Sequence, residues 1–263
     1  MASMDWSTQS GDAPARYAEF LVPAMFAPFA ERLVQHLAVR SGTSVLDVAC
    51  GTGAVSRAAA RAVGASGFVA GVDLGEPTLA IARAHGPQEG GARIEYVQSV
   101  AAALPFDDEE FDYVLCQQGL QFFPDRLPAL REMRRVLRPD GLVAVATWKD
   151  IEHSPFIAVA EALGRHLGRE AGEMMRSPFA LADGAELARL IEAAGFRDVV
   201  VRDETIECTW ATHADFARRA IAAGPVAPLF AAAPEEAQTA AAEHTFSIDP
   251  SELESFLAGL GRE

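Results

Sequence analysis

The chain has 263 residues, half of them hydrophobic and 22% of them charged, which is the composition of a globular domain large enough to bury a full core. Its 37 acidic residues outnumber its 22 basic residues, and the formal net charge is −15. Such acidity argues against a nucleic-acid partner, because phosphate backbones bind clustered Lys and Arg.

The sequence also lacks the patterns expected of a membrane span, a secretory leader, a disulfide framework or a zinc site. No apolar run approaches the about 18 residues of a membrane span, and no basic segment followed by an apolar one marks a secretory leader. The three cysteines, Cys50, Cys116 and Cys208, offer neither a disulfide framework nor the paired spacing of a zinc site. We therefore expect a cytoplasmic protein with no membrane span and no metal; monomer and homodimer both stay open.

The N-terminal part predicts a tail followed by short helices. Residues 1–13 are polar and small, whereas Phe29, Leu33 and Leu37 lie four apart, on one face of a helix. Prolines divide this helical segment into pieces, because proline lacks the N–H group that a helix interior needs.

The next hundred residues alternate between short β-rich runs and helical runs. Strands are predicted at 44–49, 67–73, 93–98, 111–117 and 142–148, and helices at 54–63, 76–84 and 124–137. Strands that alternate with helices form a parallel sheet covered on both faces, with ligands at the carboxyl ends of the strands.

Beyond residue 148 this alternation stops. Ser154 and Pro155 predict the start of a helix that runs to about residue 167. Asp183 and Glu186 have capping-box spacing, for a second helix that ends at Gly195. Three further elements are predicted towards the C-terminus: a β-rich segment at 197–208 and helices at 212–222 and 250–260.

One basic cluster lies on the helix that precedes the fifth strand. It contains Arg131, Arg134, Arg135 and Arg138, beside Glu132. Given the overall charge, we interpret this cluster as a solvated helix face rather than a nucleic-acid patch.

The loop after the first strand is the most informative segment. Residues 45–53 read Val-Leu-Asp-Val-Ala-Cys-Gly-Thr-Gly, which predicts a strand, a tight turn and a helix N-terminus. A dinucleotide site would have a third glycine where Ser56 stands. Asp47 would also repel a pyrophosphate and suits a positively charged ligand, such as an amino group or a sulfonium.

These features resemble the class I S-adenosylmethionine-dependent methyltransferases, whose first motif is an acidic residue followed by a small-x-Gly-x-Gly loop. The resemblance covers about residues 17–150 and is greatest to the small-molecule branch of ubiquinone and menaquinone biosynthesis. Its further landmarks are Val69 to Leu74, Leu104-Pro105-Phe106, Phe111-Asp112-Tyr113 and Leu137-Arg138-Pro139-Asp140-Gly141.

The resemblance implies a doubly wound α/β fold with a mostly parallel sheet of the seven-stranded type. It implies a tail and lid helices at 1–40, a cofactor-binding core at 41–150, and a C-terminal part of the same domain at 151–263 that carries substrate-covering helices and the sheet edge. The chain departs from the family at its end, because only 244–248 offers a last strand, and that segment is short.

The resemblance also implies which residues bind S-adenosylmethionine, with S-adenosylhomocysteine as product. Asp73 would accept both ribose hydroxyls, and Asp47 would act on the amino-acid end through water or backbone. The expected cofactor residues are Tyr17, Asp47, Ala49, Cys50, Gly51, Gly53, Asp73, Leu74, Ser99, Val100, Ala101 and Gln117.

Val100 departs from the family at the adenine position, where many members carry Asp. Valine cannot accept a hydrogen bond from the adenine amino group. Adenine recognition would then rest on the backbone of 99–101 and on apolar contact with Leu74, with a loss of about 1–2 kcal/mol in cofactor binding.

The end of the fourth strand reads Gln117-Gln118-Gly119-Leu120 instead of the Pro-Pro-aromatic motif of enzymes that methylate adenine or glutamine amino groups. The expected substrate pocket comprises Phe26, Gln118, Gln121, Phe122, Phe123, Trp148 and Phe156. His153 follows the fifth strand and is the candidate general base, which is needed only if the acceptor is protonated.

The sequence thus predicts methyl transfer from S-adenosylmethionine to oxygen, nitrogen or carbon of a small, partly apolar molecule, a secondary metabolite or a quinol-like compound. One alternative is a protein of the same fold that binds S-adenosylmethionine or S-adenosylhomocysteine without methylating, as a scaffold or in a cofactor-assisted rearrangement. A nicotinamide oxidoreductase is disfavoured by Ser56.

Overall fold

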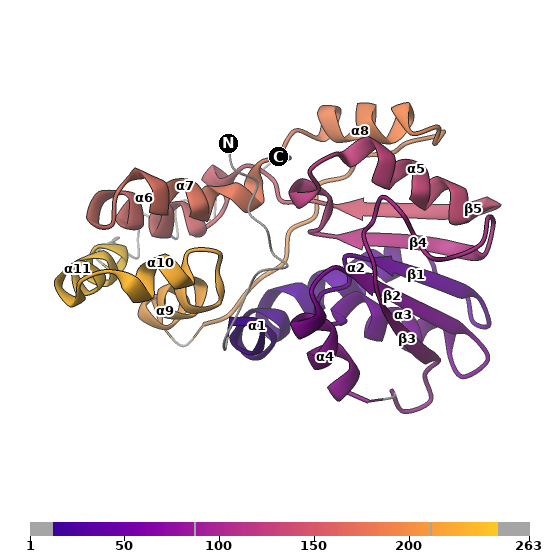
Figure 1. Cartoon of the computed structure of the whole chain (residues 1–263), viewed down its shortest axis with the longest axis horizontal. Coiled ribbons are helices and arrows are strands. Elements are labelled where there is room, and N and C mark those ends of the chain that lie inside the picture. Colours follow the sequence, from indigo (N-terminus) through magenta and orange to yellow (C-terminus); the bar gives the residue numbers. More distant parts are fainter. Residues whose placement is uncertain (1–12, 87, 211, 247–263) are drawn as a thin grey trace.

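A computed structural model of the chain describes residues 13–86, 88–210 and 212–246. At its centre lies a parallel sheet of five strands in the order β3-β2-β1-β4-β5 (Figure 1). The strands are β1 (Ser44–Val48), β2 (Phe68–Asp73), β3 (Arg93–Gln98), β4 (Phe111–Gln117) and β5 (Leu137–Ala146). The order changes direction at β1, which pairs with β2 on one side and with β4 on the other.

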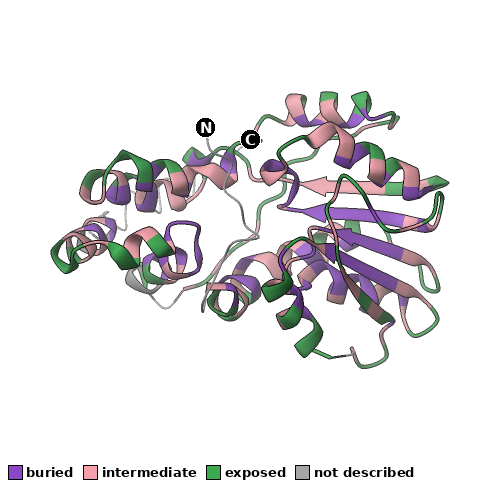
Figure 2. Ribbon diagram, viewed as in Figure 1, coloured by how far each residue is buried: buried purple, intermediate pink, exposed green. Residues whose placement is uncertain are grey.

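Helices cover both faces of this sheet, because successive side chains of each strand point to opposite faces. On one face, α2 (Ala27–His36) and α3 (Ala54–Val63) pack against Val45 and Val69. On the other face, α5 (Arg126–Val136) and α8 (Gly184–Ala193) pack against Leu46 and Val72. Helix α4 (Glu76–Ala84) contacts β2 and β3. The central strands β1, β2 and β4 are mostly buried, whereas the edge strands β3 and β5 are more exposed (Figure 2).

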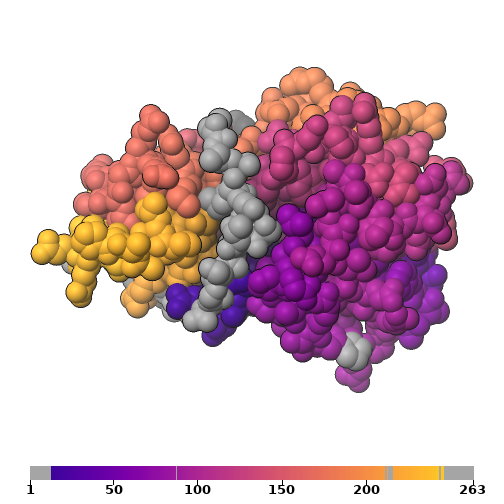
Figure 3. Space-filling view, viewed as in Figure 1, coloured from indigo at the N-terminus to yellow at the C-terminus, as the bar shows by residue number. Residues whose placement is uncertain are grey.

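Five helices form a second group beside the sheet, which we call the helical lobe: α6 (Phe156–His166), α7 (Arg169–Arg176), α9 (His213–Ala223), α10 (Ala227–Ala232) and α11 (Glu235–Phe246). Its helices share a core of their own, which includes Val159, Leu163, Met175, Ala217 and Ala241. The lobe and the sheet-containing part lie side by side in the space-filling view (Figure 3). In the described residues, none of the helices combines the length and the apolar character that crossing a bilayer requires.

The N-terminal segment joins these two parts. It consists of α1 (Ala13–Arg16) and a π-helix (Tyr17–Phe26), which contacts both α2 and α9. Leu21 and Met25 of the π-helix pack against Ala223 of the lobe. The N-terminal segment therefore lies over the carboxyl edge of the sheet, between the sheet and the lobe.

Most of the predicted elements of the core are confirmed. The predicted bounds of α3, α4, β3 and β4 coincide with the observed ones, and the helices predicted near 183–195 and 212–222 are present as α8 and α9. Strand β5 differs: it starts at Leu137 through an irregular pairing with β4 and ends at Ala146, so that Trp148 lies beyond it.

The seven-stranded expectation requires correction in the described residues, which form five strands. The β-rich segment 197–208 is irregular: it runs away from the sheet, with Asp203 bonded to Lys149 at 2.6 Å and Glu204 to His36 at 2.9 Å. A strand needs a hydrogen-bonding neighbour, which this path does not provide. Of the predicted strand 244–248, the first three residues end α11, whose Ala-rich and Glu-rich sequence favours a helix. The rest of that strand and the helix predicted at 250–260 lie outside the described residues.

The packing of α5 gives a prediction with an internal control. Leu130 is fully buried between α5 and the sheet, whereas Leu142 on β5 is 49% exposed. We expect Leu130→Ala to lower the free energy of unfolding by about 2–5 kcal/mol, since it leaves a cavity, and Leu142→Ala by less than about 0.5 kcal/mol. Chemical denaturation monitored by circular dichroism measures both values, and equal losses would contradict the packing described for α5.

Candidate active site

A cavity of about 750 Å³ lies at the carboxyl ends of β1, β2 and β4. Its walls come from the loops that follow these strands, from the π-helix, and from the helical lobe. The position follows from the strand order, because the loops after β1 and its two neighbours diverge where the order changes direction. The cavity has an acidic end over β1 and β2 and an aromatic end beneath the lobe.

Asp73, the last residue of β2, ties two loops together at the acidic end. Its carboxylate accepts a hydrogen bond from the Gly51 N–H at 2.8 Å and another from the Gly75 N–H at 2.8 Å. Burial raises the pKa of Asp73, although these backbone hydrogen bonds oppose the shift. Oδ1 also accepts from the Thr78 hydroxyl at 3.4 Å, whereas Oδ2, bonded to Gly51, keeps a lone pair for a further donor.

Asp47 of β1 lies deeper, with only 1% of its surface exposed. The Ser56 hydroxyl donates to Oδ2 of Asp47 at 2.6 Å, while Oδ1 is buried without a hydrogen-bond partner among the described residues. Burial raises the pKa of Asp47 to about 7, and the negative charge of Asp73 adds to the shift. Ser56, the residue that breaks the dinucleotide fingerprint, thus has a structural role in holding this carboxylate.

Two glycines allow the loops at this end to approach closely. Gly53 precedes α3 with a φ of 81°, and a Cβ atom there would overlap the Tyr96 hydroxyl. A Cβ atom on Gly119, after β4, would lie 2.6 Å from the Cβ atom of Ala49, after β1. A larger side chain at Gly119 would force the loops after β1 and β4 apart, and one at Gly53 would displace the Tyr96 side chain of β3.

Two apolar side chains are exposed beside the acidic end. Leu74 is 47% exposed and Val100 is 45% exposed, and both line the cavity together with Ser99 and Ala101. Exposed apolar surface within a cavity is suited to a flat, weakly polar ligand group.

The aromatic end is a chain of ring contacts that crosses from the N-terminal segment to the lobe. Phe26 lies 4.9 Å from Tyr17 and 5.7 Å from Trp148, measured between ring centroids. Trp148 lies 6.0 Å from Phe179, which lies 6.1 Å from Phe156. These contacts leave an apolar space bounded by large, flat side chains.

Glutamines at the end of β4 lie between the two ends. The Gln117 side-chain N–H donates to the backbone oxygen of Phe26 at 2.9 Å, which links β4 to the N-terminal segment. Gln118 has a φ of 55°, unusual for a residue with a side chain, and lines the cavity. Gln121 is buried behind it and donates to the Gln118 side-chain oxygen at 3.4 Å.

The charges of the described lining residues are all of one sign. They include Asp47, Asp73 and Asp125, and they include no Lys, Arg or His. A cationic ligand group is therefore favoured at the acidic end, and a pyrophosphate is disfavoured.

The structure brings most of the predicted site residues to this cavity. Those that line it are Tyr17, Phe26, Asp47, Ala49, Cys50, Gly51, Asp73, Leu74, Ser99, Val100, Ala101, Gln117, Gln118, Phe122, Phe123, Trp148 and Phe156. Three predicted residues are not in the lining. Gly53 lies behind the loop, Gln121 lies behind Gln118, and His153 is exposed at the end of a short 3₁₀-helix (Ile151–His153).

Sequence reasoning expected lid helices before residue 40 and substrate-covering helices after residue 151, and it named Phe156, but it missed most of the lining residues that the helical lobe and the N-terminal segment contribute. The missed lining residues include Leu21, Met25, Met175, Phe179, Ala220, Ala223, Gly224 and Pro225. Their helical pattern was a usable signal for an apolar face, but a periodic pattern does not say which neighbour that face covers.

Comparison with known proteins gives concordant matches. The model of the ubiE/COQ5 methyltransferase family matches residues 27–216. A demethylmenaquinone methyltransferase of Staphylococcus aureus is 36% identical over 189 residues, which cover 66% of this chain and 76% of that protein.

Solved structures resemble the fold at lower identity. A SAM-dependent methyltransferase from Aquifex aeolicus matches with a TM-score of 0.55 and 21% identity, over 70% of this chain and 88% of its own. The YcgJ protein from Bacillus subtilis matches with a TM-score of 0.55 and 20% identity, over 81% of this chain and 87% of its own. At this identity the likeness supports the doubly wound fold alone.

The environment of Asp47 predicts a pH-dependent stability. Its pKa rises in the folded protein from 3.8 to about 7, so the folded state binds the extra proton between these values and is destabilised as the pH rises through them. We expect Asp47→Asn, which stays neutral, to gain stability relative to the unsubstituted protein by up to about 1.4 kcal/mol per pH unit from about pH 4 to pH 7.

Urea unfolding of the ligand-free protein at several pH values measures this difference, with the exposed Asp140→Asn as control. A difference between Asp47→Asn and the unsubstituted protein that stays constant from pH 4 to pH 8 would contradict the environment described for Asp47.

Proposed function

The chain belongs to the ubiE/COQ5 methyltransferase family and is an S-adenosylmethionine-dependent methyltransferase, and from that premise we propose that its methyl acceptor is a small, uncharged, partly apolar aromatic molecule of the quinol type. The observation that carries this proposal is the division of one cavity into an acidic end and an aromatic end.

The acidic end fits the cofactor. The described lining carries no basic residue, and Asp47 has a buried oxygen with no partner among the described residues, which suits a ligand with an amino group and a sulfonium. When bound, the cofactor supplies a methyl group on that positively charged sulfur. Asp73 would accept hydrogen bonds from the ribose hydroxyls, and the loop at Gly51 would face the amino-acid end. Leu74 and Val100 would cover the nucleobase.

The aromatic end receives the acceptor. Phe26, Trp148, Phe156 and Phe179 present flat faces, and rings of this kind pack well against a planar aromatic molecule. Apart from the rim residue Asp125, this end offers no charged group in the described lining, so an uncharged acceptor is favoured. The relative from Staphylococcus aureus is named for demethylmenaquinone, a substrate of compatible chemistry.

The chain promotes the reaction mainly by positioning. Methyl transfer from a sulfonium is an in-line displacement, and holding two reactants in line contributes about 7–11 kcal/mol in favourable cases. The N-terminal segment and the lobe exclude water from the cavity. The role of His153 as general base stays a prediction. Its exposed side chain lies outside the described lining and would have to move to reach an acceptor.

A turnover assay tests the acceptor class. Incubation with methyl-labelled cofactor and a panel of phenols, quinols and amines should give labelled product with ring hydroxyl compounds and none with charged amines. A protein that binds the cofactor and labels no member of the panel would favour the alternative of binding without methylation. Product from the charged amines alone would contradict the proposed acceptor.

Val100 gives a second prediction. Because valine cannot accept a hydrogen bond from the adenine amino group, Val100→Asp should tighten cofactor binding by about 1–2 kcal/mol. Calorimetric titration with S-adenosylhomocysteine measures the change. Val200→Asp is the matched control, since Val200 is 70% exposed and lies outside the described lining. Unchanged binding in Val100→Asp would count against adenine at this position.

A further inference from the structure

We infer that Glu132 and Arg135 of α5 are positioning residues for the cofactor, because together they fix the backbone of the loop 99–106 that walls the nucleobase part of the cavity. The inference depends on the proposed function, which assigns the start of this loop to the nucleobase. Neither residue lines the cavity, so each acts through the loop.

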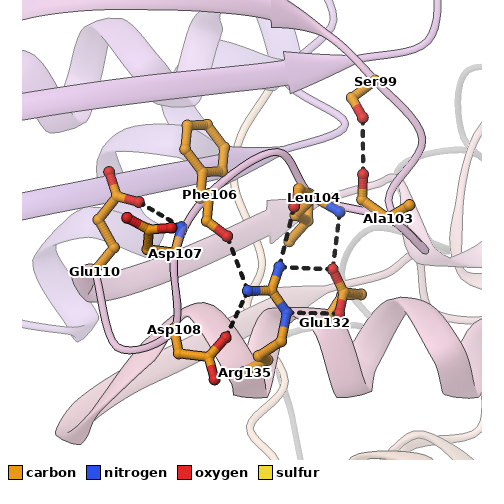
Figure 4. A network of polar contacts seen from close by, with 9 residues as sticks. All are labelled: Ser99, Ala103, Leu104, Phe106, Asp107, Asp108, Glu110, Glu132 and Arg135. Atoms are coloured by element: carbon orange, nitrogen blue, oxygen red, sulfur yellow. Dashed lines mark hydrogen bonds and ion pairs between the residues drawn. The ribbon is translucent and has the colours of Figure 1, made fainter.

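Arg135 is the centre of a network of polar contacts (Figure 4). Its guanidinium donates to the backbone oxygen of Leu104 at 3.0 Å and to that of Phe106 at 2.8 Å. It also donates to both carboxylate oxygens of Glu132, each at 2.8 Å, and to Asp108 at 2.8 Å. Glu132 in turn accepts from the Leu104 N–H at 2.9 Å. Two side chains of one helix thus hold three backbone groups of the loop.

Both members of the pair stay charged. The bond from Arg135 holds the pKa of Glu132 below its usual range, and the carboxylates of Glu132 and Asp108 raise the pKa of Arg135. The side chains of Arg135 and Glu132 are only 31% and 21% exposed. The interpretation of the basic cluster as a solvated face is therefore wrong for Arg135, although Arg131, Arg134 and Arg138 are exposed.

The other end of the loop is held from β2. The Ser99 N–H donates to the backbone oxygen of Asp73 at 3.1 Å, and the Ser99 hydroxyl donates to that of Ala103 at 2.9 Å. Leu104 is buried in the core. The segment 99–102, which lines the cavity, is consequently a short span fixed at both ends.

The fixed position of segment 99–102 is important for cofactor binding because residue 100 is a valine. Without a hydrogen-bonding side chain at that position, recognition of the nucleobase depends on backbone groups of 99–102 and on the placement of two apolar side chains. Release of the loop from α5 would displace these backbone groups and side chains, and would therefore weaken all of their contacts with the nucleobase. The acceptor would be unaffected, since the aromatic end belongs to the N-terminal segment, Trp148 and the lobe.

Binding and kinetic measurements on matched variants test the inference. In Arg135→Ala, we expect the affinity for S-adenosylhomocysteine and the KM for the cofactor to worsen about tenfold, while the KM for the acceptor is unchanged. Arg134→Ala, one residue away on the exposed face, should leave all three unchanged, because Arg134 is bonded in the described part of the chain to the backbone oxygen of Gly195, at 3.4 Å, and not to the loop 99–106. Arg135→Lys should recover part of the loss, since a lysine keeps the charge and loses the fork.

Glu132→Gln is the milder variant, which can still accept from the Leu104 N–H and loses the ion pair. If Arg135→Ala does not fold, the same binding and kinetic measurements on Glu132→Gln test the positioning role. Two results in either variant would overturn the positioning role and leave the proposed function standing. One is a KM that worsens equally for cofactor and acceptor, and the other is a lower Tm with unchanged cofactor affinity. Failure of the unsubstituted protein to bind S-adenosylhomocysteine would instead remove the proposed function, and this inference with it.

Discussion

The carboxylate of Asp73 joins the two loops between which the cavity opens. It accepts from Gly51, in the loop after β1, and from Gly75, in the loop after β2. Both loops start from neighbouring parallel strands, so one partly buried carboxylate sets the width of the crevice between them. Asp73 thus positions the tight turn at Gly51 and Gly53 as well as the start of α4. The loop 99–106 is held by the same residue, because the Ser99 N–H donates to the backbone oxygen of Asp73.

Asp47 is buried and Asp73 is partly buried, and the described lining holds no basic residue, so that two neighbouring carboxylates are unfavourable in the ligand-free protein. Burial raises the pKa of both groups, and the negative charge of Asp73 raises the pKa of Asp47 further. A positively charged ligand would relieve this repulsion, whereas a pyrophosphate would add to it. Selection against dinucleotides thus follows from charge as well as from the missing glycine at Ser56.

Local sequence patterns were sufficient to predict the fold and the site where secondary structure and ligand geometry arise from neighbouring residues. The alternation of apolar runs predicted β1 to β4, the glycine loop predicted the turn after β1, and the resemblance to the family implied most of the other residues of the acidic end. The patterns failed where pairing partners decide the outcome. The segment 197–208 has β-forming residues but no strand beside it, and the role of Arg135 depends on loop carbonyls about 30 positions away in the chain. Apart from Phe156, the lobe residues of the cavity were missed for the same reason.

Part of the aromatic end lies outside the region that matches the family, and this bears on how acceptor choice could be set. The carboxylates and glycines of the acidic end all lie within residues 27–216, the part that matches the family. Ala220, Ala223, Gly224 and Pro225 of the aromatic end lie beyond it. Their small side chains leave room beside Met175 and Phe179, and a larger residue on this part of α9 would shorten the space without touching Asp47 or Asp73. Under the proposed function, the lobe would therefore limit the size of the acceptor and the loops of the sheet would place the cofactor, so that the two specificities could vary separately.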